Sequence, residues 1–95
     1  MPIVSTGGNV VEYAAGTGVV TANTWALARI RWVSSGALAG DICLVTDTAG
    51  NVIFESEATG ADWSDEVELG KMPPFIGIKV ATLTGSRGNV FFYLR

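Results

Sequence analysis

Carboxylates are the side chains of this sequence that come closest to forming a reactive group. They fall in two sets. Asp62, Asp65, Glu66 and Glu68 lie close together in the sequence, and Asp41 and Asp47 lie on either side of an apolar run. Two acids opposed across a bound sugar would suit a glycosidase, and a cluster of carboxylates would suit a hard cation. Neither set has the regular spacing of a calcium loop. The sequence contains no histidine, which removes the commonest general base and the usual zinc ligand.

The acidic run from Glu55 to Glu68 alternates with apolar residues, which is typical of strands with one wet face. We therefore expect a solvated face that keeps the protein soluble and blocks strand edges. The alternative is an electrostatic contact with a basic partner. On either interpretation we expect no catalytic residue, no metal site and no cofactor.

Other candidate features favour structural roles. Cys43 is the single cysteine and lies in the apolar run ICLV, so we expect a small buried hydrophobe. The stretches GTGVV and TGSRG lack the context of a phosphate-binding loop and read as turns. Six scattered basic residues and a net charge of −3 argue against nucleic acid. No apolar stretch approaches the length of a membrane span, so we expect no membrane partner and synthesis in a reducing cytoplasm.

The composition predicts an all-β fold. With 95 residues, 48% of them hydrophobic and 16% charged, the chain can bury a core and should fold as a single domain over residues 1–95. Twelve glycines among many Val, Ile and Thr favour short strands and tight turns. We expect a small antiparallel β-sandwich, or a barrel-like variant, of about seven or eight short strands.

The first third of the chain predicts an edge strand, a hairpin and a central strand. Ile3 to Thr6 is the edge candidate, and Val10 to Ala14 with Val19 to Ala22 forms the hairpin around AGTG. Trp25 to Ser34 is the longest continuous strand candidate. Its alternation places Arg29 and Arg31 on one face and Ile30 and Trp32 on the other.

The remainder predicts a second hairpin and a closing pair. Asp41 to Asp47 and Asn51 to Ala58 flank a short glycine-containing turn. Asp62 to Leu69 alternates again, before the stiff GKMPP connection. Phe75 to Thr84, with Ile76, Ile78 and Val80 on one face, and Asn89 to Leu94 then close the domain around Gly85 to Gly88.

The tryptophans have two interpretations. Exposed indole rings would form a platform on which a sugar could stack. Trp32 and Trp63 alternate with polar neighbours as core residues do, so we expect them to pack inside. The pattern does not settle the position of Trp25.

Several strands carry apolar residues on both faces. One small domain has too little interior of its own to cover all of them. Ile42 to Val45 is one such segment, and Phe91 and Tyr93 point opposite to Val90 and Phe92 in another. Something must cover the second face, and other copies of the chain are the economical choice. We therefore expect a homo-oligomer that associates through Phe91 and Tyr93.

Two stretches resemble a family of small structural proteins of tailed bacteriophages. They are IRWVSSGALAGDICLVTDTAGNVIFESEATGADW and PPFIGIKVATLTGSRGNVFFYL, which lie between Ile30 and Leu94. The shared features are an I-R-W strand, an A-G-D turn, a D-x-x-G-N-V hairpin and a closing pair G-x-x-V-x-x-L…G…V-x-x-Y-L. The resemblance implies a non-enzymatic virion component, such as a capsid decoration or cement protein, and supplies no catalytic residue.

The resemblance also implies partners and a location. The partner would be the major capsid protein, the location the capsid surface of the virion, and the favoured oligomer a trimer. The first residues match no shared feature, so residues 1–24 are the candidate partner-contact segment, with Ile3 and Val4 for shell contact. The alternative is a carbohydrate-binding or host-surface-recognition β-module of a phage particle.

Overall fold

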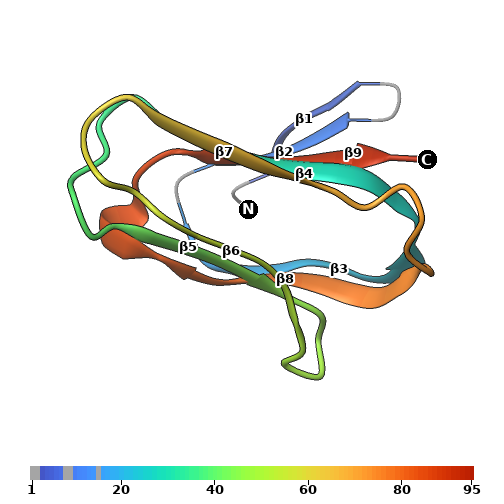
Figure 1. Cartoon of the computed structure of the whole chain (residues 1–95). Helices are drawn as coiled ribbons and strands as arrows, with labels where there is room; N and C mark the ends of the chain where they lie inside the picture. Colours follow the sequence, from blue (N-terminus) through green and yellow to red (C-terminus); the bar gives the residue numbers. More distant parts are fainter. Residues whose placement is uncertain (1–2, 8–9, 15) are drawn as a thin grey trace.

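The computed structural model describes residues 3–7, 10–14 and 16–95, which form two antiparallel sheets packed face to face (Figure 1). The strands are β1 (Ile3–Gly7), β2 (Val10–Ala14), β3 (Gly18–Trp25), β4 (Leu27–Ser34), β5 (Ile42–Thr46), β6 (Val52–Glu57), β7 (Trp63–Glu68), β8 (Phe75–Leu83) and β9 (Asn89–Leu94), with a short 3-10 turn η1 (Thr84–Ser86). The predicted all-β sandwich is confirmed. The described residues form nine strands, slightly more than expected.

The chain crosses repeatedly from one sheet to the other. The five-stranded sheet has the order β1-β2-β9-β4-β7, and the four-stranded sheet has the order β3-β8-β5-β6. Only β1–β2 and β5–β6 are hairpins within the described strands; every other connection crosses from one sheet to the other. The β5–β6 hairpin and the edge position of β1 are as predicted.

The predicted hairpin of Val10–Ala14 with Val19–Ala22 is wrong. β2 pairs with β1 and β9, whereas β3 pairs with β8 in the opposite sheet. Val11, Tyr13 and Val20 are all buried. Burial of these side chains in the shared core stabilises the fold more than a local hairpin between β2 and β3 would. The small-residue segment that joins β2 to β3 is therefore a crossover between the sheets.

β4 is the predicted central strand, flanked by β9 and β7. Ile30 and Trp32 are fully buried, while Arg29 and Arg31 lie on the outer face. The strand begins later than predicted, because Trp25 ends β3 and the chain changes sheet at Ala26.

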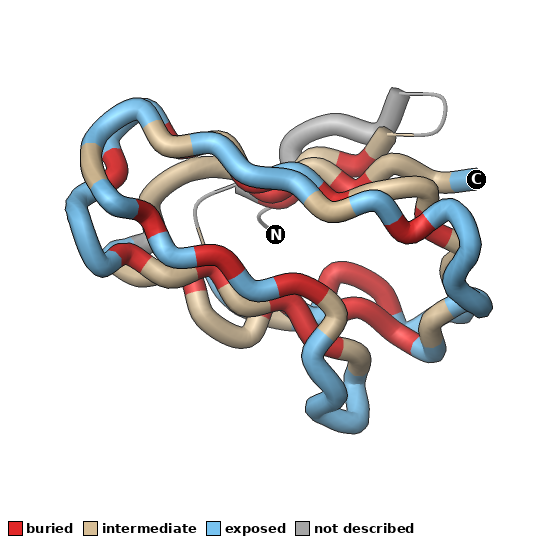
Figure 2. The backbone as a smooth tube through the Cα atoms, in the orientation of Figure 1, coloured by how far each residue is buried: buried red, intermediate tan, exposed pale blue. Residues whose placement is uncertain are grey.

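The core lies between the sheets, where the red segments of Figure 2 face one another. Its largest fully buried side chains are Trp32, Tyr13, Phe92, Leu27, Ile30, Ile78, Val45, Val80 and Val90, with Cys43 among them. Cys43 is thus the buried hydrophobe that was predicted. Burial raises the pKa of its thiol to about 12, which keeps the thiol protonated and unreactive.

Strand β8 departs from the predicted alternation at its start. Ile78 and Val80 are buried, but Ile76 is 72% exposed instead of sharing their face. Gly77 has a φ of +80° between them, a conformation that reverses the alternation and favours glycine. Thr48, at the tip of the β5–β6 hairpin, packs on this glycine and donates a hydrogen bond of 3.1 Å to the Ile76 carbonyl.

The contact at Gly77 gives a stability prediction. A Cβ there would clash with the side chain of Thr48, in addition to the strain of a positive φ. We expect Gly77→Ala to lower the free energy of unfolding by about 2 kcal/mol or more, measured by urea denaturation. Gly50→Ala is the matched control, because Gly50 has a φ of +95° but open space around it. Equal losses from both substitutions would contradict the proposed packing of the hairpin tip.

Candidate functional site

The carboxylate of Asp41 forms a structural clamp. It is buried at the start of β5 and accepts hydrogen bonds from Arg87 Nε at 2.6 Å and from Arg87 Nη2 at 2.7 Å. The backbone N–H of Leu38 donates to it as well, at 3.0 Å. These interactions, Arg87 foremost, lower the pKa of Asp41 to about 2. The clamp joins the β4–β5 connection to the β8–β9 connection, two crossovers far apart in sequence.

Asp47 is engaged in the β5–β6 turn. Its Oδ1 accepts the backbone N–H groups of Ala49 and Asn51 at 3.0 and 2.9 Å, and its Oδ2 accepts Asn51 Nδ2 at 2.9 Å. The hydrogen bonds, first that from the Asn51 side chain, lower the pKa of the Asp47 carboxyl. Asp41 and Asp47 therefore both act in the fold, each with its oxygens occupied.

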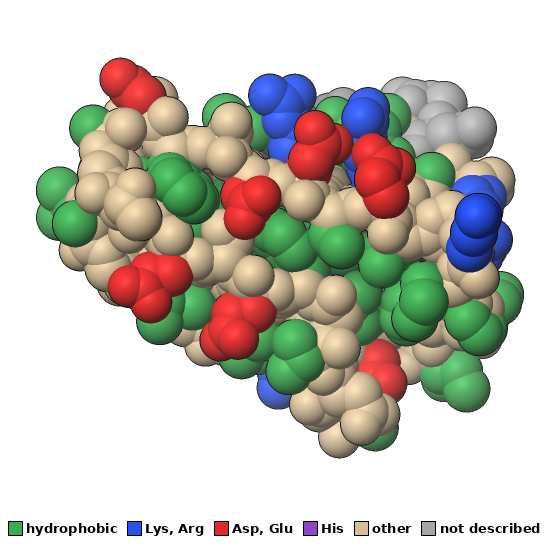
Figure 3. All heavy atoms as spheres, in the orientation of Figure 1, with side chains coloured by type: hydrophobic (Ala, Val, Ile, Leu, Met, Phe, Trp, Pro, Cys, Tyr) green, Lys and Arg blue, Asp and Glu red, His purple; other side chains and the backbone are tan. Residues whose placement is uncertain are grey.

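The remaining acids of the run decorate the open side of the sandwich. Figure 3 shows separate acidic side chains on this side of the molecule, with apolar atoms between them. The exposed acids of β6, β7 and the connection between them are Glu55, Glu57, Asp62, Asp65, Glu66 and Glu68. β6 and β7 are the sheet edges on this side. Among the residues that the structure describes, no three potential ligands are grouped to hold a metal ion. Charge on edge strands opposes unwanted pairing, in agreement with the solvated face that was predicted.

The outer face of the five-stranded sheet carries the two predicted self-association residues. Phe91 and Tyr93 lie on β9, half-buried, opposite Arg31 and Arg29 of β4. The guanidinium of Arg29 stacks 4.3 Å from the centre of the Tyr93 ring. Its Nη1 also lies 3.3 Å from Glu66 Oε2 on β7. Aromatic rings and arginines thus alternate across the middle of this face, which we call the aromatic face.

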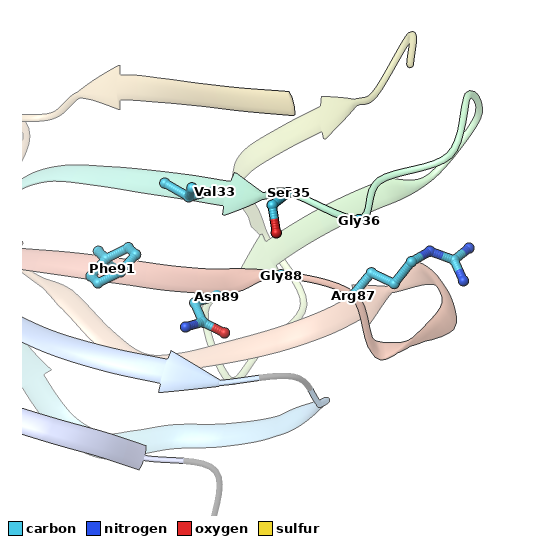
Figure 4. Close-up of a pocket in the computed structure, with 7 residues that line it drawn as sticks. All are labelled: Val33, Ser35, Gly36, Arg87, Gly88, Asn89 and Phe91. Atoms are coloured by element: carbon cyan, nitrogen blue, oxygen red, sulfur yellow. The ribbon is translucent and has the colours of Figure 1, made fainter. Parts of the chain in front are cut away.

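A depression of about 340 Å³ opens at one end of the aromatic face. Figure 4 shows Phe91 and Asn89 on β9 beside Val33 and Ser35, with the Arg87 side chain directed away. Two of its polar side chains are already engaged, because Asn89 Nδ2 donates to Glu12 Oε2 and Arg87 binds Asp41. A depression whose arginine and amide side chains are engaged, next to the aromatic face, suits a macromolecular contact better than a reaction.

The other predicted residues have separate positions. Ile3 and Val4 fall on edge strand β1, and their side chains lie outside the described residues. Trp32 is in the core, and Trp63 is partly buried against it, as predicted. Trp25 is also partly buried against the core. The three tryptophans therefore do not form an exposed platform.

Sequence reasoning missed Arg87 and Ser34. Arg87 lies in a glycine-rich turn, and nothing near it in the sequence points to Asp41, 46 positions away. Ser34 was expected only as the end of a strand, yet its Oγ is buried and has no hydrogen-bond partner among the described residues.

Comparisons with known proteins leave the family open. No protein-family model matches the chain, and neither the curated proteins nor the solved structures give a match. Within the described ranges, no helix is long and apolar enough to cross a membrane.

The Asp41 clamp predicts a specific acid sensitivity. Because the folded-state pKa is below the ordinary value of 3.8, the clamp contributes fully above about pH 4 and is lost as pH falls toward about 2. We expect Asp41→Asn to be less stable than the parent at neutral pH and to lose less stability across that acid window. Urea unfolding at several pH values measures both effects.

Glu57→Gln is the control for this experiment, since Glu57 is exposed on edge strand β6. It should retain the parent's pH dependence in the same window. Parallel curves for the parent and Asp41→Asn would contradict the assignment of the clamp.

Proposed function

We propose that this chain is a non-enzymatic structural protein of a phage particle, attached to the outside of the capsid shell and associated with its own copies. The observation that carries the proposal is the aromatic face, where Phe91, Tyr93, Arg29 and Arg31 meet on the outer surface of a sheet. Aromatic residues and arginine are the types most enriched where proteins bind one another.

The arrangement of this face supports association. β9 has a strand on each side. The rings of Phe91 and Tyr93 therefore lie in the middle of the outer face, away from the sheet edges. The stack of Arg29 on Tyr93 holds both side chains in one arrangement before any partner arrives. Side chains that are already ordered lose less entropy on binding.

The phage assignment itself comes from the resemblance, and the structure explains what the resembling motifs do. The A-G-D turn contains Gly40, with a φ of +92°, and Asp41, which forms the clamp. The D-x-x-G-N-V hairpin contains the capping Asp47 and Gly50. These motif residues maintain the sandwich, so proteins that share them would share this fold.

The proposed partner is the major capsid protein, and the proposed location is the virion surface. A shell offers many identical sites, so a weak contact per copy becomes strong when linked copies bind together. Contact between identical faces would give a dimer, whereas contact between different surfaces of neighbouring copies closes into a ring such as the trimer implied by the resemblance. Residues 1–24, with Ile3 and Val4, remain the proposed shell-contact segment.

Removal of the two rings tests self-association. We expect Phe91→Ala with Tyr93→Ala to weaken association at least about tenfold, because buried aromatic anchors dominate interface energies. Sedimentation velocity over a concentration series measures the oligomer, and co-sedimentation with purified phage shells measures attachment.

Val52→Ala is the control, since Val52 is an exposed apolar residue on the opposite sheet. It should leave association unchanged, and urea unfolding shows whether each variant is folded. A parent protein that stays monomeric at every concentration and does not sediment with shells would overturn the proposal.

A further inference from the structure

The connection between β7 and β8 carries an exposed apolar tip. Met72 is 46% exposed, and the exposed Pro73 and Pro74 follow it. Lys71 comes directly before it, exposed and without an ion pair in the part of the chain that the structure describes. We call residues 71–74 the proline tip. It presents apolar side chains to solvent beside a positive charge.

Arg95 holds the proline tip in place. Its Nη1 donates to the Gly70 carbonyl and its Nη2 to the Met72 carbonyl, both at 2.6 Å. The Met72 backbone N–H also donates to the Leu69 carbonyl at 3.0 Å, and two prolines restrict the backbone that follows. Because the guanidinium bonds neutral carbonyls, its positive charge adds to that of Lys71. A tip that is already ordered loses little entropy when it binds.

The open side of the sandwich carries apolar side chains among negative charges. Ile53 on β6, and Trp63 and Val67 on β7, pack against the core and remain partly exposed. We call these three side chains of the two edge strands the open seam. Asp65 links the two strands, because its Oδ2 accepts a hydrogen bond from Ser56 on β6 at 2.8 Å. Figure 3 shows the apolar atoms of this side between separate acidic side chains.

Carboxylates lie on both strands of the open seam. Glu55 and Glu57 are exposed on β6, and Asp65 and Glu68 are exposed on β7. None of these four carboxylates belongs to an ion pair within the described ranges. Negative charge on edge strands opposes backbone pairing. It equally favours a cationic partner that contacts the side chains between the strands.

From these two surfaces we propose that the proline tip of one copy docks on the open seam of a second copy. Met72 packs on the apolar side chains of the seam, since a flexible thioether adapts to irregular surfaces. Lys71 and Arg95 then lie among the carboxylates of the two edge strands. An anionic membrane would also attract the tip but would repel these strands. The chain itself carries the complementary surface, which favours a second copy as the partner.

The contact joins different surfaces of the two copies. It therefore runs head to tail, and it either closes into a ring or extends a chain of copies. It uses neither Phe91 nor Tyr93, so it is a second association surface beyond the function proposed above. It depends neither on the aromatic face nor on a capsid.

Two chains, each with one surface disabled, test the contact. The first carries Lys71→Ser and Met72→Ser, which remove the cation and the apolar side chain of the tip. The second carries Glu55→Lys and Glu57→Lys, which make the seam repel the tip. Each chain alone has no matching pair of surfaces, whereas the mixture retains one tip and one seam. Both chains also lack the two rings of the aromatic face, so failure of this contact is distinguished from failure of the association proposed above.

Sedimentation velocity should show monomers for each chain alone and a 1:1 dimer in the mixture. Raising NaCl from about 0.05 M to about 0.5 M should weaken the dimer about tenfold, because salt screens the charges. With the first chain isotope-labelled, NMR should show that the second chain shifts the Trp63 indole signal and the amide signals of residues 63–68. The NMR measurement can be repeated with both rings of the aromatic face restored, so the test does not depend on their removal.

Leu38→Ser in the second chain is the matched control. Leu38 is 59% exposed and follows the end of β4, whereas the proline tip lies near the start of that strand, where the Leu69 N–H donates to the Ala28 carbonyl. The control should leave the dimer unchanged. The proposal is overturned if the mixture stays monomeric at every concentration, if either chain dimerises alone, or if Leu38→Ser weakens the dimer as much as the tip substitutions do. Binding of the second chain to phosphatidylserine vesicles but not to the first chain would overturn it as well.

Discussion

The bidentate pair between Asp41 and Arg87 fixes the end of the sandwich where the depression beside Phe91 lies. It ties the β4–β5 crossover to the β8–β9 crossover, and a hydrogen bond of 3.0 Å from the Ile42 backbone N–H to Thr84 Oγ1 reinforces it. The Arg87 carbonyl also accepts Trp32 Nε1 at 3.4 Å. One carboxylate thereby sets the position of the chain entering β9 and of the segment leaving β4. Its oxygens are both used in this way, so Asp41 supports the end of the aromatic face without being part of it.

The alternation of apolar and polar residues predicted the strands well where each stays within one sheet. The β5–β6 hairpin is an example, because Asp47 and Gly50 encode the turn locally. Prediction failed where the chain changes sheet, as between β2 and β3 and at Ala26, because the partner strands are distant in sequence. It also failed at Ile76, where the conformation of Gly77 depends on contact with Thr48.

The candidate site was predictable only in part, for a similar reason. The sequence predicted Phe91 and Tyr93 as contact residues, because a strand that is apolar on both faces needs a layer packed against each face. The structure adds that Arg29 covers one of these rings from the neighbouring strand. The unpartnered hydroxyl of Ser34 escaped sequence reasoning, since only the pairing of β4 with β7 brings Ser34 beside Trp63. Neither residue is unusual for its local sequence.

The repeated crossings between sheets also determine how such a chain reaches its native state. Of the strand pairings described, only the β1–β2 and β5–β6 pairs join neighbouring segments; the rest close long loops. The entropy cost of closing these loops comes before the contacts that offset it. Folds of this kind therefore form over milliseconds to seconds, not microseconds. During that interval β9, apolar on both faces and destined for the middle of its sheet, has no partner on either side. When many copies are synthesised rapidly, β9 is therefore the strand with the most exposed apolar surface before it pairs. Its pairing with β2 and β4 completes the larger sheet.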